Sequence, residues 1–469
     1  MYNIKFNVKN NTQDVELGEE QKNALLSILT FINSSNMSIT LSGAAGTGKT
    51  TLVKELLMEI DKLDIIYTLA APTHKAKLVL ENLSGEKAYT LHQLLALQPN
   101  LNLFDLDLRD LDFFSSKSKS SNMIERDSLI IIDEASMIND ELYDFIIKKA
   151  KAKRSKILWV GDIKQLCPVG KKGLSKVFEN DNIIILSKIY RQKEDSPVLD
   201  LLTNLRENAD FHIQSKTGNE DNIYTYDDTI KFLKASKPYL KDMYSSGNVL
   251  DIKLLAHTNN RVNSFNLAAR KLIFGKDCEN ELNENEILTA YDNYKSGKSI
   301  ISNSSDYIIT NTPKKELFYI AHFNTGLVGY KLNLYDTVEK TNNNITLLSK
   351  DNDPKVIDKL ASLIDNTRTS AVASAAVGIK AKALWAKYYM LMDSFTVMED
   401  LFHNNRVVKR KTFDYGYAMT IYKSQGSGFN RVFIDLTDIN IVRDLEQIRQ
   451  LQYVGISRTK GDVYILNGS

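Results

Sequence analysis

The residues with the clearest chemical potential lie between positions 43 and 51. Gly43 and Gly48 are separated by four residues and followed by Lys49 and Thr50, which is the spacing of a loop that wraps phosphate groups. Glycines let consecutive backbone N–H groups turn toward phosphate oxygens, and Lys49 would reach the outer phosphates while the Thr50 hydroxyl binds Mg²⁺. We therefore predict a nucleoside triphosphate site with these binding residues: Gly43, Ala44, Ala45, Gly46, Thr47, Gly48, Lys49, Thr50 and Thr51.

A pair of carboxylates follows a run of four aliphatic residues, 129–132. Such a run is typical of a parallel strand that is buried on both faces, and ligands bind beyond the carboxyl ends of these strands. Asp133 could hold Mg²⁺ through water, and Glu134 could polarise the attacking water as a general base. A strand followed by an acidic helix start is the alternative, and the upstream phosphate loop argues against it.

A third apolar segment, 156–161, ends at Asp162 and Gln165. At that edge of the sheet a neutral amide could bond both the γ-phosphate and the water, and so respond to the bound nucleotide. A solvated surface glutamine is the alternative.

Hydroxyl and imidazole side chains stand at the start of two further helical patterns. They are Thr73 and His74 in one segment, and Thr90 and His92 in the next. These groups suit contacts with nucleic-acid phosphates that carry no sequence information. Helices with ordinary N-caps have the same appearance, so both interpretations stay open.

Composition excludes several classes of protein. The chain has 469 residues, 43% of them hydrophobic and 25% charged, with a net charge of +2, which predicts two to four globular domains and no polycationic tail. Two distant cysteines, Cys167 and Cys278, provide neither a disulfide framework nor zinc spacing. The first residues lack an apolar signal segment, and no run approaches the ~18 apolar residues that span a bilayer. We therefore expect a cytoplasmic protein without membrane contacts.

The motifs, taken in chain order, resemble those of superfamily 1 helicases, in the RecD-like branch that moves 5′→3′. They are Gln21, GAAGTGKT (43–50), APTHKAK (71–77), TLHQL (90–94), IIDEAS (131–136), GDIKQLCPV (161–169), IYRQ (189–192), AHTNN (256–260), TIYKSQG (420–426) and YVGISRTK (453–460). The correspondence covers nearly the whole chain and is loose only between about 280 and 410.

The resemblance implies roles for residues on both sides of a nucleotide cleft. Gln21 would read the adenine edge, and Arg191 and Arg458 would be arginine fingers that stabilise charge on the transferring phosphate. A surface arginine or a simple salt bridge is the alternative for each arginine. The implied cofactors are ATP and Mg²⁺.

The resemblance also implies a single-stranded DNA track. Besides the four residues above, its members would be Thr258, Asn259, Thr420, Lys423 and Ser424. Two positions depart from the family: Tyr422 stands where histidine is usual, and Gly428 stands where many relatives have an acidic residue. Contacts borrowed from the family for those two positions are therefore in doubt.

The implied fold is α/β, with two RecA-like P-loop motor domains and ATP between them. The first carries a hairpin insertion, and the second carries a small SH3-like β-barrel with helices. The expected boundaries are 1–95 and 127–205 for the first motor domain, 96–126 for the hairpin, 206–275 and 412–469 for the second motor domain, and 276–411 for its insertion.

The two insertions raise separate questions. In the first, leucines alternate with acidic residues before a Ser-Lys tract, which favours a hairpin over a disordered loop. Phe113 and Phe114 precede its tip and could separate the strands of a duplex, or could anchor the insertion in the core. In the second, short strands precede at least two helices, whose aromatic residues Trp385, Tyr388, Tyr389 and Phe395 could stack on bases but favour helix packing.

The leading hypothesis is an ATP-dependent DNA helicase that translocates on single-stranded DNA. A protein-displacing translocase without efficient unwinding and an RNA-directed helicase are the alternatives. We expect single-stranded and fork DNA as partners, with a single-stranded-DNA-binding protein or replisome components as further candidates. A monomer is the simplest state, because both arginine fingers come from the same chain. The resemblance to phage proteins implies action in the cytoplasm of an infected bacterium, while direction rests on the resemblance alone.

Overall fold

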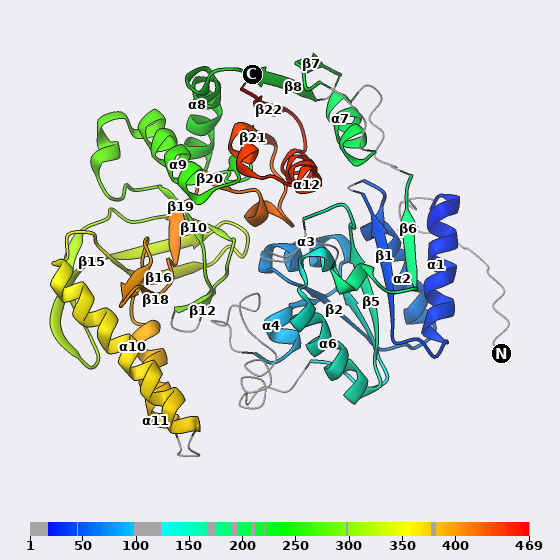
Figure 1. Cartoon of the computed structure of the whole chain (residues 1–469), viewed down its shortest axis with the longest axis horizontal. Coiled ribbons are helices and arrows are strands. Elements are labelled where there is room, and N and C mark those ends of the chain that lie inside the picture. The colour runs from blue at the N-terminus through cyan, green and yellow to red at the C-terminus, as the bar shows by residue number, and fades with distance from the viewer. Residues whose placement is uncertain are drawn as a thin grey trace.

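The computed structural model describes residues 17–44, 46–97, 123–166, 175–188, 196–207, 212–219, 221–296, 299–376 and 381–468. The hairpin expected at 96–126 falls almost entirely outside these residues, as do Phe113, Phe114, Arg191 and Ala45. Three β-sheets of six strands organise the described residues into a first lobe, a second lobe and an insertion (Figure 1).

The first lobe is built on a parallel sheet in the order β3-β2-β4-β5-β1-β6. Its strands are β1 (Ser38–Gly43), β2 (Tyr67–Ala71), β3 (Ala88–Thr90), β4 (Leu129–Ile132), β5 (Lys156–Gly161) and β6 (Ile183–Leu186). Helices α1 (Glu19–Ile32), α2 (Lys49–Lys62) and α3 (His74–Ser84) cover one face, and α4 (Leu91–Leu94) and α6 (Asp140–Lys153) cover the other. All four residues of β4 are buried, which confirms the prediction of a central strand covered on both faces.

The second lobe repeats this architecture with the sheet order β20-β9-β21-β22-β8-β7, parallel except at β7. Its strands are β7 (Lys216–Thr217), β8 (Asn222–Tyr226), β9 (Ile252–Ala256), β20 (Ala418–Thr420), β21 (Arg431–Asp435) and β22 (Val463–Leu466). Helices α8 (Thr229–Ser246) and α9 (Asn259–Phe274) pack on one face, and α7 (Pro197–Arg206) and α12 (Leu445–Ile456) pack on the other.

Helix α7 differs from the sequence-based boundary at residue 205. Val198, Leu201 and Leu205 are buried in the same apolar cluster as Ile434 and Val454 of the second lobe. The apolar face of α7 therefore belongs to the core of the second lobe, although the sequence placed most of this helix in the first motor domain. A local pattern shows that a helix has an apolar face, but does not show which sheet receives it.

The insertion contains an antiparallel sheet in the order β14-β15-β13-β10-β19, with β16 paired to β15. Its strands are β10 (Ile287–Ala290), β13 (Asp306–Ile309), β14 (Lys315–Ile320), β15 (Phe323–Asp336), β16 (Asn342–Leu348) and β19 (Phe413–Tyr415). Two small hairpins accompany it: β11 (Tyr294–Ser296) with β12 (Ser299–Ile301), and β17 (Leu401–His403) with β18 (Arg406–Lys409). The short strands expected in this insertion are confirmed, while closure into a barrel stays a prediction.

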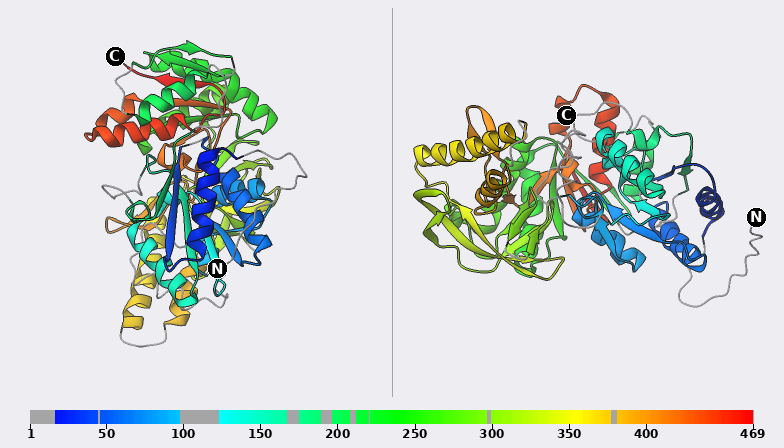
Figure 2. Two further views of the ribbon diagram at one scale, coloured as in Figure 1. Left: turned by 90° about the vertical axis from the view of Figure 1, so that its right-hand side faces the viewer. Right: turned by 90° about the horizontal axis from the view of Figure 1, so that it is seen from below.

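Two helices, α10 (Pro354–Ala376) and α11 (Lys382–Met392), follow the inserted strands as the sequence predicted. Phe395 is fully buried, and Trp385 and Tyr389 stack on each other with ring centroids 5.9 Å apart. These contacts favour the helix-packing interpretation of the aromatic residues. The insertion and α1 lie at opposite ends of the molecule (Figure 2). Within the described part of the chain, none of the helices is both long enough and apolar enough to cross a membrane.

Candidate nucleotide and nucleic-acid sites

The loop that joins β1 to α2, residues 43–50, is here called the phosphate loop. Gly48 has φ +76°, and a Cβ atom there would lie 2.2 Å from Gln21 Nε2. At Gly43 a Cβ would lie 2.5 Å from Thr47 Oγ1. Both glycines are therefore required by close approach, and Gly48 also by its left-handed backbone. The loop ends at the positive N-terminus of α2, as an anion site requires.

Lys49 is the first residue of α2, and its side chain folds back over the phosphate loop. Its Nζ donates to the carbonyl oxygens of Gly43 at 2.7 Å and Ala44 at 2.9 Å. The ammonium group thus lies at the mouth of the loop, where it could bind phosphate oxygens. Thr50 and Thr51 are half-buried in the first turn of the same helix.

Gln21 of α1 is fixed against this loop. Its Nε2 donates to the Thr47 carbonyl oxygen at 3.1 Å, and its Oε1 accepts from the Gly18 N–H at 3.0 Å. The side chain is 4% exposed. The amide therefore orders the phosphate loop in this structure, and its contact with adenine stays a prediction.

Asp133 and Glu134 turn sharply away from the end of β4. Glu134 has φ +50°, and its N–H donates to Asp133 Oδ1 at 2.8 Å. Such a backbone is strained for a residue with a side chain, and strain of this kind is common at functional sites. Burial and the charge of Glu134 raise the pKa of Asp133 to about 6, although the Glu134 N–H and Lys49 act in the opposite direction. A cation beside Asp133 would act in the same direction as Lys49 and favour the ionised carboxylate.

Gln165 comes to this turn from the end of β5. Its Oε1 accepts from the Ser136 hydroxyl at 3.5 Å, and Ser136 lies in η1 (Ala135–Met137), directly after Glu134. Gln165 is 6% exposed. The structure therefore brings the carboxylate pair and the glutamine together at one edge of the first sheet.

Asp162, three residues before Gln165, has partners that the sequence did not indicate. It is fully buried and accepts hydrogen bonds from Arg206 of α7 and Tyr453 of α12. Its position after a buried strand marked it as part of the site, but its partners lie 44 and 291 residues away. No spacing within the sequence connects such groups.

Arg458 follows the C-terminus of α12. Its Nε donates to the Val454 carbonyl oxygen at 3.0 Å, and its Nη2 donates to the Ser457 hydroxyl at 2.8 Å. It is 6% exposed. The guanidinium group is therefore held at the end of its own helix, and a finger role for it stays a prediction, as it does for Arg191.

Three threonines of the predicted DNA track are helix N-caps. Their hydroxyl oxygens accept from backbone N–H groups: Thr73 from Ala76 at 3.2 Å, Thr90 from Gln93 at 3.3 Å and Thr258 from Arg261 at 3.2 Å. Capping alone accounts for a threonine at each of these positions. Each cap also places a helix N-terminus at the carboxyl edge of a parallel sheet, which suits phosphate contact. Asn259, next to one cap, is exposed, and His92 is half-buried.

His74 and Thr258 also bind carboxylates. His74 Nε2 lies 2.9 Å from Glu339 Oε1 of the insertion. Burial lowers the pKa of His74, although Glu339 opposes this shift. The Thr258 hydroxyl donates to Asp438 Oδ1 at 2.9 Å. Both side chains are therefore engaged within the protein in this structure.

The segment 420–426 lies against the start of α3. A Cβ on Gly426, where φ is +71°, would lie 3.3 Å from Ala76 Cβ. This contact brings the second-lobe part of the track beside Thr73 of the first lobe. Thr420 Oγ1 accepts from the Lys423 N–H at 3.2 Å, whereas Ser424 is fully buried and donates to the Ile421 carbonyl oxygen at 2.7 Å.

Lys423 points toward the insertion. Its Nζ donates to Asn303 Oδ1 at 3.0 Å and lies 3.6 Å from the centre of the Tyr291 ring. Burial and the nearby charge of Lys411 lower the pKa of Lys423 to about 7. The side chain is thus a cation whose charge would respond to a phosphate placed beside it.

Comparison with known proteins shows what this chain is similar to. A model described as an AAA domain matches residues 16–227, and one described as a UvrD-like helicase C-terminal domain matches residues 415–466. The ATP-dependent DNA helicase dda of Enterobacteria phage T4 is 25% identical over 96% of this chain and 99% of its own length. The chain is thus similar to superfamily 1 helicases of the branch that includes RecD and Pif1.

Two further relatives of this branch match almost the whole chain. The RecBCD enzyme subunit RecD of Buchnera aphidicola subsp. Schizaphis graminum is 25% identical over 98% of this chain and 75% of its own length. The crystal structure of Pif1 helicase from Candida albicans superposes with a TM-score of 0.52 at 17% identity, covering 97% of this chain and 95% of that one. The superposition supports the two-lobed fold.

Both departures from the superfamily 1 pattern have identifiable contacts in the structure. The Tyr422 hydroxyl accepts from Gln447 Nε2 of α12 at 3.0 Å. A Cβ on Gly428 would lie 3.0 Å from Lys460 Cε. The tyrosine thus bonds its segment to a helix of the second lobe, whereas the contact at position 428 is with the flexible end of an exposed lysine.

Proposed function

We propose that this chain is an ATP-dependent DNA helicase that translocates on single-stranded DNA and separates duplex DNA. The observation that carries the proposal is the convergence of the phosphate loop, the Asp133–Glu134 turn and Gln165 at one edge of the first sheet. That edge faces residues of the second lobe through Asp162. Nucleotide chemistry between two lobes is what an ATP-driven motor requires.

Each residue of the nucleotide site has a separate proposed role in hydrolysis. The backbone of the phosphate loop and Lys49 would hold the phosphates, and Glu134 would orient and deprotonate the attacking water. Thr50 and Asp133 fit a cation, because a hydroxyl and a carboxylate are oxygen ligands of the kind that Mg²⁺ takes. When bound, Mg²⁺ supplies neutralisation of phosphate charge. Gln165 would contact the γ-phosphate, and Arg191 and Arg458 would stabilise charge on the transferring phosphate.

Movement along DNA would come from changing contacts between the lobes. Thr73, Thr90 and Thr258 place helix N-termini where they can hold phosphates, and Thr420 and Lys423 extend this track in the second lobe. Alternation of grip between the two lobes, driven by closure on ATP, would move the chain in one direction.

The finer features of the proposal concern the insertions, the direction and the partners. We propose that the antiparallel inserted sheet is an SH3-like module, that the segment 96–126 is a strand-separating hairpin and that the domain boundaries stand as predicted except at α7. The likeness to the phage helicase supports 5′→3′ movement and action in the cytoplasm of an infected bacterium. Because both proposed arginine fingers belong to one chain, we propose that it acts as a monomer, on single-stranded and fork DNA. A single-stranded-DNA-binding protein or replisome components are its candidate protein partners.

The test is strand separation on duplexes with one single-stranded tail. Unwinding from a 5′ tail and none from a 3′ tail is the expected result. The opposite preference would overturn the direction. ATP hydrolysis without strand separation would favour a protein-displacing translocase, and a matched RNA-tailed duplex tests the RNA-directed alternative.

A further inference from the structure

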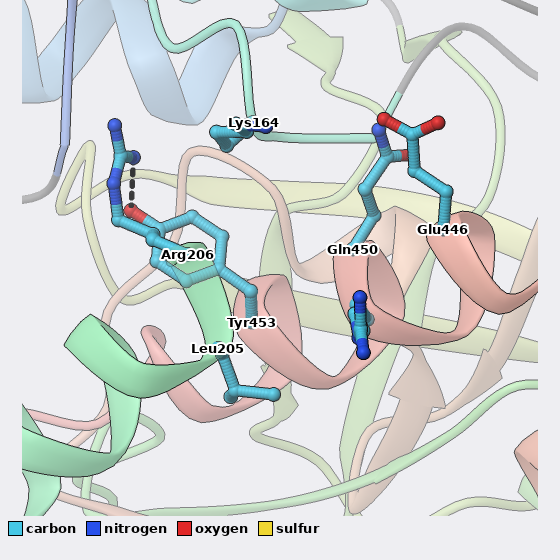
Figure 3. A pocket seen from close by; sticks show the side chains of 7 residues that line it. Lys164, Leu205, Arg206, Glu446, Gln450 and Tyr453 are labelled. Atoms are coloured by element: carbon cyan, nitrogen blue, oxygen red, sulfur yellow. Dashed lines mark hydrogen bonds between the residues drawn. The ribbon is translucent and has the colours of Figure 1, made fainter. Parts of the chain in front are cut away.

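The loop that carries Gln165, residues 162–166, belongs to the first lobe and follows β5; it is here called the sensor loop. The Asp162 carboxylate makes one of the contacts between this loop and the second lobe. Arg206 Nη1 lies 2.9 Å from both carboxylate oxygens, and the Tyr453 hydroxyl donates to Oδ2 at 2.8 Å. Arg206 Nη1 also donates to the Tyr453 hydroxyl at 3.2 Å, as Figure 3 shows.

At the other end of the sensor loop, Leu166 contacts the second lobe. This side chain is 1% exposed and lies in the apolar cluster of the second lobe, with Leu201 of α7 and Ile421. Gln425 Nε2 of the second lobe donates to the Leu166 carbonyl oxygen at 3.4 Å. Gln165 therefore lies between two points that the second lobe holds.

The second-lobe residues that contact the sensor loop adjoin two functional regions, the end of α12 with Arg458 and the predicted DNA track. Tyr453 is in α12, whose C-terminus leads to Arg458 and whose Val454 carbonyl accepts from that arginine. Gln425 precedes Gly426, which packs against Ala76 at the start of α3. The sensor loop thus connects the nucleotide edge with the predicted DNA track.

Burial makes separation of the Asp162 carboxylate from Arg206 unfavourable. The carboxylate is 0% exposed and the Arg206 side chain 18% exposed. A buried charge without a partner is strongly unfavourable, so the two groups must remain together while the lobes are in contact. The Tyr453 hydroxyl contributes to both partners at once, because it donates to the carboxylate and accepts from the guanidinium.

We propose that Arg206 and Tyr453 are positioning residues that bind the sensor loop to the second lobe, so that Gln165 and the DNA track move together. The proposal rests on the proposed function, because it concerns the coupling of DNA binding to hydrolysis. Neither residue contacts the reacting atoms. Weakening the link should therefore reduce the stimulation of hydrolysis by single-stranded DNA and leave hydrolysis without DNA nearly unchanged.

The experiment compares Tyr453→Phe with Tyr239→Phe. Both remove one hydrogen-bonded tyrosine hydroxyl, but the Tyr239 hydroxyl bonds Tyr464 within the second lobe, 2.8 Å away. Tyr453→Phe should lower the ratio of turnover with and without single-stranded DNA by about tenfold, the factor for one hydrogen bond to a charged group. Tyr239→Phe should keep the parental ratio. An unchanged ratio in Tyr453→Phe, or an equal fall of both rates, would overturn the proposal.

Two substitutions of Arg206 provide a graded second measurement. Arg206→Lys keeps a charge that can reach Asp162 and should retain part of the DNA stimulation. Arg206→Met removes the charge and should retain less than Arg206→Lys. Equal stimulation in these two variants would also contradict the proposal.

A fluorescence measurement separates failure of this proposal from failure of the proposed function. Fluorophores on α6 and α8 report the approach of the lobes when a non-hydrolysable ATP analogue binds. If the parent protein hydrolyses ATP without any response to DNA, the proposed function fails. The link is still tested, since Tyr453→Phe should require about tenfold more analogue for the same change. An identical titration curve would overturn it.

Discussion

Lys423 should make DNA affinity depend on pH in a range where most lysines do not titrate. Its ammonium group lies over Tyr291 and donates to Asn303, and burial and Lys411 lower its pKa to about 7. If a DNA phosphate lies beside this group, it favours the charged form and raises the pKa in the complex. Binding then takes up a proton.

The sign and size of the effect follow from this linkage. A group whose pKa rises on binding contributes its full affinity below its free pKa and loses that contribution as the pH rises through its bound pKa. From about pH 7 upward the dissociation constant should therefore increase, by at most tenfold per pH unit for one proton, or about 1.4 kcal/mol. The increase ends near the pKa in the complex.

The assay is fluorescence anisotropy of a labelled oligothymidine at constant ionic strength between roughly pH 7 and pH 9. Lys423→Met is the matched variant, because it keeps the length of the side chain and removes the charge. The parent protein should show the rise in dissociation constant, and Lys423→Met should bind weakly with a flat profile. A flat parental profile, or the same slope in both proteins, would refute the role given to Lys423.

The remaining predictions concern the nucleotide site and the first insertion. Lys49→Ala removes the cation at the mouth of the phosphate loop and should reduce DNA-stimulated hydrolysis by ~10³-fold or more, which a folded variant with a tenth of parental turnover would disprove. Glu134→Gln should reduce hydrolysis by ~10²-fold while a fluorescent ATP analogue still binds; lost binding with normal turnover of the remainder would count against it. Replacement of both Phe113 and Phe114 by Ala should impair strand separation and spare hydrolysis, since stacking is worth ~1–3 kcal/mol per base; normal unwinding would end this hypothesis.

The nucleotide site could be predicted in detail because its signals are local. A glycine at position 48 is required by a left-handed backbone and by the neighbouring Gln21 amide, and the spacing to Lys49 follows from the turn itself. The buried strand before Asp133 shows itself as four consecutive aliphatic residues. The inserted strands from 306 to 348 were predictable for the same reason, since alternation and turn residues are properties of neighbouring positions.

The groups that join the lobes could not be predicted because their partners are distant in sequence. Asp162 meets Arg206 and Tyr453 only after two sheets have formed and docked. His74 was predicted as a DNA contact, but nothing local indicated that Glu339 of the insertion lies beside it. Ser424 was also predicted as a DNA contact, because a hydroxyl suits phosphate. In this structure its side chain is fully buried and bonded to a backbone carbonyl, which the residue type alone does not indicate.

The central claim is that this chain converts ATP hydrolysis into movement on single-stranded DNA. The most direct measurement is steady-state ATP hydrolysis by the parent protein with and without a single-stranded oligonucleotide, at saturating ATP and Mg²⁺. The account predicts hydrolysis that increases strongly with single-stranded DNA and saturates as the track fills. A rate that is the same with and without DNA would contradict the account.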